Sequence, residues 1–62
     1  MTHSEKVVDL LHAGQFEDMA KELAEAIETD GLDLLTDLAE YLSMMGFMDE
    51  SRQVYEKITT VD

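Results

Sequence analysis

Histidine and carboxylate side chains are the groups in this chain that could bind a metal ion or move a proton. The chain has two histidines, His3 and His12, among fifteen acidic residues. A metal site on a helix needs its ligands three or four residues apart on one face, and a separation of nine residues does not place the two imidazoles in this way. We expect His12, near the end of a predicted helix, to meet free backbone carbonyls or water. The sequence therefore predicts no metal site.

The acidic segment 28–33 has the glycine and carboxylate content of a calcium-binding loop. When Gly31 is set at the glycine that such a loop requires, the first ligand position falls on Ala26. An alanine side chain cannot coordinate calcium, so the loop lacks its first ligand. We interpret Asp30 and Asp33 instead as caps around a break between two helices.

The same region, DGLDLL over 30–35, gives this short acidic chain a faint similarity to acyl carrier proteins. That family carries a phosphopantetheine arm on a serine at the start of a helix. No serine lies between Ser4 and Ser43, so the attachment point is missing. No nucleophile is paired with a base and no glycine-rich phosphate loop is present. We expect neither a cofactor nor catalytic activity.

The charge of the chain limits its partners. Fifteen acidic residues against four basic ones give a net charge of −11 over 62 residues. This field repels nucleic acid and anionic membranes and favours encounter with basic partners. Three explanations fit this excess of acidic residues: an ordinary solvated surface, a surface for a basic partner, and adaptation to high salt. The N-terminus lacks the pattern of a signal peptide and no apolar run reaches the roughly 20 residues that cross a bilayer, so a cytoplasmic protein is expected.

The chain nearly repeats itself at a spacing of about 31 residues, which is typical of stacked helix-turn-helix units. Leu11 falls on Leu42 and Phe16 on Phe47. Apolar residues three and four apart predict helices over about 4–13, 16–29, 32–45 and 48–60. Three glycines separate the helices, and Thr2 with Glu5 forms a capping box before the first. The short connections make neighbours antiparallel, so we expect one all-α domain over 1–62, made of two helical hairpins with repeats at about 4–30 and 32–60.

The segment from Leu35 to Asp62, LTDLAEYLSMMGFMDESRQVYEKITTVD, resembles the tetratricopeptide repeat, in which large and small residues alternate so that paired helices approach closely. The first half matches less well, because bulky Val8 stands where a small residue is usual. The early aromatic residue and the closing proline of the family are absent. The positions that carry the resemblance are Leu35, Leu38, Ala39, Leu42, Gly46, Ser51, Tyr55 and Ile58.

The resemblance implies a non-catalytic protein–protein interaction module, such as a small adaptor or regulatory subunit. Its partner would have a basic or mixed basic and apolar surface and would lie along the inner face formed by the first helix of each repeat. The residues of that face would be Asp9, His12, Thr36, Glu40, Ser43 and Met44.

A second group of candidate binding residues surrounds Gly46 and the last helix. Methionine packs adaptably, so this corner either fills the space between two helices or forms part of an interface. Two repeats are fewer than an independent stack usually needs, so the last helix has an open side that could pair with a second copy. Two other functions remain open: an acidic mimic of DNA that occupies a nucleic-acid-binding protein, and a docking segment of a larger assembly. The residues in question are Met44, Met45, Phe47, Met48 and Tyr55.

Overall fold

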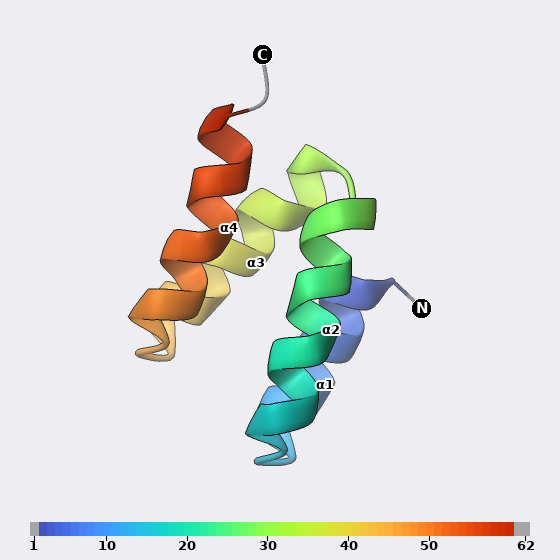
Figure 1. Cartoon of the computed structure of the whole chain (residues 1–62). Helices are drawn as coiled ribbons and strands as arrows, with labels where there is room; N and C mark the ends of the chain where they lie inside the picture. The colour runs from blue at the N-terminus through green and yellow to red at the C-terminus, as the bar shows by residue number, and fades with distance from the viewer. Residues whose placement is uncertain (1, 61–62) are drawn as a thin grey trace. The chain divides into compact units, whose positions relative to one another are not determined.

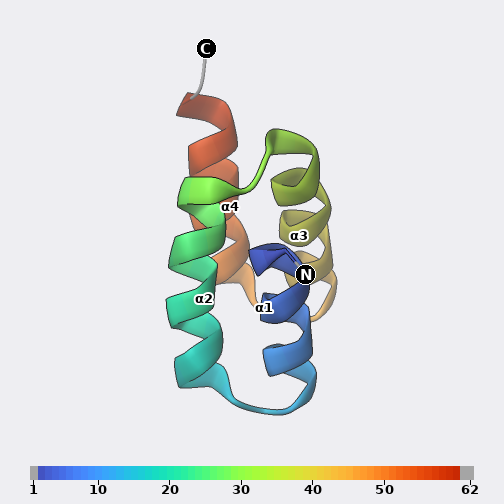
Figure 2. The same ribbon diagram turned by 90° about the vertical axis from the view of Figure 1, so that its right-hand side faces the viewer.

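The computed structural model describes residues 2–60, which form four α-helices: α1 (His3–His12), α2 (Phe16–Thr29), α3 (Leu32–Met44) and α4 (Met48–Thr60). No strand occurs within residues 2–60. Helix α1 packs on α2 and α3 packs on α4, each pair as an antiparallel hairpin (Figures 1 and 2). The predicted all-α fold of two helical hairpins is confirmed. The first hairpin belongs to unit 1 (Met1–Asp30) and the second to unit 2 (Gly31–Asp62).

The helix bounds follow the sequence prediction closely because local signals set them. The predicted spans of α2 and α4 match the structure. Helix α1 begins and ends one residue earlier than expected, and α3 ends one residue earlier. The predicted capping box is present: the Thr2 hydroxyl accepts from the Glu5 N–H, and the Glu5 carboxylate accepts from the Thr2 N–H. Gly31 separates α2 from α3 as predicted. It has extended backbone and is the N-cap of α3, while Asp30 is the C-cap of α2.

Both hairpins turn through the same backbone motif. The helix is followed by a glycine in the left-handed region, Gly14 at φ +76° and Gly46 at φ +89°. The N–H after each glycine donates back to a carbonyl of the last helical turn, Gln15 to Leu10 at 3.0 Å and Phe47 to Leu42 at 2.8 Å. This Schellman arrangement satisfies carbonyls that the end of a helix leaves without partners, and it reverses the chain within three residues.

The turns and the buried side chains of the two hairpins follow slightly different spacings. Gly14 and Gly46 lie thirty-two residues apart, one residue more than the spacing that pairs Leu11 with Leu42. In α1 and α3 the buried side chains keep the shorter spacing, since Leu11 and Leu42 are both buried. Unit 2 has one extra residue between its last core leucine and its glycine. One added residue turns a helix by about 100°, so the turn leaves from a different side of the helix.

Each unit buries its own stripe of apolar side chains. The buried hydroxyl of Ser51 in unit 2 donates to the Ala39 carbonyl of α3 at 2.8 Å, which satisfies it without water. Two small residues at this crossing allow α3 and α4 to approach closely. The buried apolar residues are Val7, Leu11, Met19, Leu23 and Ala26 in unit 1 and Leu35, Leu38, Ala39, Leu42 and Val54 in unit 2.

The turn glycines give a direct test of backbone strain. A Cβ added at Gly46 or at Gly31 would meet no atom within 4 Å, so only their backbone angles distinguish them. We expect Gly46→Ala to lower the free energy of unfolding by about 1–2 kcal/mol, because L-residues are disfavoured at positive φ. Gly31→Ala, at φ −69°, should change it by less than about 1 kcal/mol. Urea unfolding followed by circular dichroism measures both, and equal losses would contradict this account of the turn.

Candidate functional site

A hollow in unit 2 lies where α3 ends and α4 begins. Its volume is about 260 Å³, and Ser43, Met48, Ser51, Arg52 and Tyr55 line it. The four residues from α4 are three and four apart, so they share one face of that helix. Ser43 lies at the end of α3, and its hydroxyl contacts the Met48 sulfur at 3.8 Å. The hollow is therefore lined by methionine and tyrosine together with two serines and an arginine.

Three methionines of the Gly46 corner are exposed, and we call them the methionine rim. Met44 is 82% exposed, Met48 58% and Met45 46%. They do not fill the space between α3 and α4, which Leu42 and Val54 occupy instead. The exposure of the methionine rim argues against the interpretation that it fills the space between two helices, and its role in an interface stays a prediction. Flexible thioether side chains here can adapt to the shape of an apolar partner.

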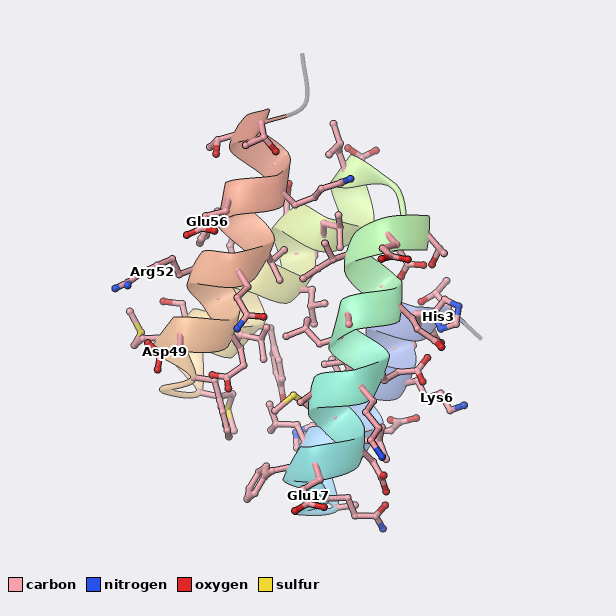
Figure 3. All side chains as sticks on the ribbon, in the orientation of Figure 1. His3, Lys6, Glu17, Asp49, Arg52 and Glu56 are labelled. Atoms are coloured by element: carbon pink, nitrogen blue, oxygen red, sulfur yellow. The ribbon has the colours of Figure 1, made fainter. Side chains whose placement is uncertain are left out.

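The one charged residue that lines the hollow is Arg52, and the other charged residues of α4 are three acids and one lysine. Asp49, Glu56 and Arg52 project outward from α4 in Figure 3. Within residues 2–60 the Arg52 guanidinium forms no ion pair. Its long aliphatic stem can pack beside an apolar group while the guanidinium stays in water. An occupant of the hollow therefore meets apolar and polar contacts inside, with acidic side chains on the helix around them.

The structure brings together some of the predicted binding residues and separates others. Ser43, Met48 and Tyr55 meet in the hollow, and Phe47 is half-buried in the turn beside it. Of the predicted inner-face residues, Thr36 is half-buried and donates its hydroxyl to the Leu32 carbonyl of its own helix at 2.8 Å. Glu40 is exposed on α3, and both Asp9 and His12 are exposed on α1. The inner face shared by both repeats stays a prediction. The single domain over 1–62 also stays a prediction.

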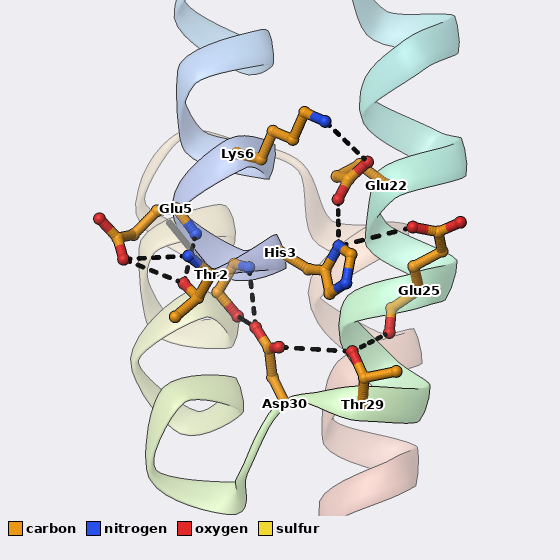
Figure 4. Close-up of polar contacts among 9 residues, drawn as sticks. Thr2, His3, Glu5, Lys6, Glu22, Glu25, Thr29 and Asp30 are labelled. Carbon is orange, nitrogen blue, oxygen red and sulfur yellow. Dashed lines mark hydrogen bonds and ion pairs between the residues drawn. The ribbon is translucent and has the colours of Figure 1, made fainter.

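A second cluster, in unit 1, was missed by the sequence analysis. The His3 Nδ1 contacts Glu22 Oε2 directly and lies 3.5 Å from Glu25 Oε2 (Figure 4). Lys6 Nζ lies 3.9 Å from the other oxygen of Glu22. The hydrogen bond with Glu22 outweighs partial burial and raises the pKa of His3 above 6.5. The spacing of the two histidines along the chain does not reveal this cluster, because its signal in the sequence is a pair of glutamates three residues apart on another helix.

Asp30 joins the end of α2 to the start of α1. Its Oδ2 accepts from the Ser4 N–H at 2.8 Å and from the Ser4 hydroxyl at 2.6 Å. Asp30 therefore caps the N-terminus of α1, on the other helix of the hairpin. The sequence predicted it only as a cap at the break between α2 and α3. Burial tends to raise the pKa of Asp30, but the hydrogen bonds from Ser4 and Thr29 together with the nearby charge of His3 outweigh burial and hold the pKa below 3.8.

No family model, curated protein or solved structure matches this chain. Across residues 2–60, every helix is too short or too polar to cross a membrane. The fold and the two sites define the class: a small, acidic, all-α chain of two helical hairpins, with an apolar hollow on one hairpin and a histidine–glutamate cluster on the other.

Proposed function

We propose that this chain is a non-catalytic protein–protein interaction module of tetratricopeptide-like type that acts in the cytoplasm. One observation carries the proposal: the methionine rim stands exposed beside the hollow of unit 2. Exposed apolar side chains gathered at one place, with a concave surface next to them, are typical of binding sites for other proteins. The hollow has room for one large apolar side chain of a partner.

The partner we propose is a protein segment that combines an apolar residue with neighbouring lysines or arginines. The apolar residue fills the hollow against Met48 and Tyr55. The flanking basic residues meet the acidic side chains of α4, among them Asp49 and Glu56. Because the chain has a net charge of −11, such a segment is also attracted from a distance, which speeds association.

Short synthetic peptides test this proposal. Each carries one leucine or phenylalanine flanked by lysines, and a matched set carries glutamates in place of the lysines. With the chain labelled at the methionine methyl groups, NMR titration should move the signals of Met44 and Met48 and leave that of Met19, which is buried in unit 1. The lysine peptides should bind more tightly than the glutamate peptides, and binding should persist in moderate salt.

A matched pair of variants locates the binding surface. Met48→Gln should weaken peptide binding by about tenfold, equivalent to about 1.4 kcal/mol, because it replaces an apolar contact in the hollow. Leu32→Gln is the control, since Leu32 is 43% exposed on α3 and does not line the hollow. Equal effects of the two variants would contradict the proposed site. Binding that disappears in moderate salt would favour the alternative of a DNA mimic, and a dimer seen by light scattering would favour a second copy as the occupant.

A further inference from the structure

The histidine–glutamate cluster of unit 1 brings three metal-ligating side chains from two helices to one point. One donor atom from each of His3, Glu22 and Glu25 lies within 4.8 Å of the other two. His3 begins α1, and the two glutamates lie three residues apart on α2, so they project from the same side of that helix. We propose that these side chains form a binding site for one divalent ion of the zinc type, which links α1 to α2.

The spacing of the donor atoms suits a shared ion after small side-chain rotations. Ligands that bind zinc at roughly 2.0–2.2 Å lie about 3–4 Å from each other. The separation of 3.5 Å between His3 Nδ1 and Glu25 Oε2 already falls in this range. Glu25 is free to adjust because its side chain is 63% exposed. Glu22, whose side chain is only 12% exposed, supplies a carboxylate that its surroundings hold in place.

The chemistry of the donors selects the kind of ion. One imidazole nitrogen with two carboxylates suits zinc and neighbouring transition metals, whereas magnesium and calcium prefer oxygen ligands alone. Two carboxylates and a neutral imidazole also balance the charge of a divalent ion. Lys6 Nζ lies near Oε1 of Glu22, while Oε2 faces His3. This ammonium group lies beside Oε1 and leaves Oε2 directed at His3, and water fills the remaining positions around the ion.

An ion at this place would stabilise a hairpin that has no covalent link. The chain has 62 residues and no cysteine, and chains of this size commonly rely on a disulfide, a metal or a partner for stability. Zinc bound by both helices stabilises the folded hairpin and not the unfolded chain, so its binding free energy adds to folding.

Titration with zinc chloride tests the site. The chain is used without a purification tag and with its N-terminal amine acetylated, so that neither supplies a ligand. We expect calorimetry to show one zinc ion per chain and the thermal midpoint to rise as zinc is added. His3→Gln and Glu25→Gln should each weaken binding at least about tenfold and remove the thermal shift, while circular dichroism without zinc shows that both variants remain helical.

Two control variants separate this site from general attraction of cations to an acidic surface. Glu28→Gln removes the same charge from an exposed position on α2 outside the cluster, and His12→Gln removes the other imidazole. Each should change the zinc affinity by less than about twofold. The proposal is overturned if no saturable binding is detected, if Glu28→Gln weakens binding as much as Glu25→Gln, or if His12→Gln and not His3→Gln abolishes it.

Discussion

Leu42→Ala should lower the free energy of unfolding by about 2–5 kcal/mol. Leu42 is fully buried on α3 and is one of the largest buried side chains of the molecule. Its carbonyl also accepts the N–H of Phe47 in the turn, so the same residue belongs to both the core and the chain reversal. A chain of this length has a total stability of only roughly 3–9 kcal/mol. The cavity left by the substitution should therefore remove a large part of it.

Urea unfolding followed by far-ultraviolet circular dichroism measures this loss. Leu32→Ala is the matched control, because it is the same substitution on the same helix at a position that is 43% exposed. It should cost less than about 1 kcal/mol. If the two substitutions have similar effects, Leu42 does not lie in a packed core and the assigned core of unit 2 is wrong.

Asp30→Ala should lower the free energy of unfolding by about 1–3 kcal/mol. The substitution removes the acceptor for both the N–H and the hydroxyl of Ser4. Ser4 is itself buried, so its polar groups would lose their partner without full access to water. The N-terminus of α1 would also lose a carboxylate that its dipole favours. Asp30→Asn keeps an acceptor oxygen and should therefore cost less than the alanine variant.

The ionisation of Asp30 predicts how stability depends on acid. Because the pKa of Asp30 is held below 3.8 in the folded chain, the folded state favours the ionised carboxylate. The resulting stabilisation is fully present above the ordinary pKa and is lost as the pH falls through the lowered pKa. Unfolding measured between neutral pH and pH of about 3 should show a shallower acid dependence in Asp30→Asn than in the parent chain. Glu28→Gln, which removes an exposed carboxylate from α2, is the control variant.

Local sequence patterns predicted those features of this protein that depend on residues near one another in the chain. The spacing of apolar residues predicted α2 and α4 with their observed bounds, and Thr2 with Glu5 predicted the first cap. Gly14 and Gly46 marked the turns. Each of these features rests on contacts within four or five residues, through helical hydrogen bonds, caps and the tolerance of glycine for positive φ. Such contacts can be recognised in the order of the residues.

The distant residues that meet, and the apolar residues that stay exposed, could be identified only once the helices were packed against each other. Asp30 reaches Ser4 across twenty-six residues and His3 reaches Glu22 across nineteen, and no local pattern specifies those pairs. In a chain with fifteen acidic residues, many carboxylates were equally available to His3. Methionine at Met44 was equally compatible with a core or a surface, because its side chain suits both. The side of each helix that faces its partner determines both which distant residues meet and whether Met44 is exposed. Packing across the hairpin fixes that side.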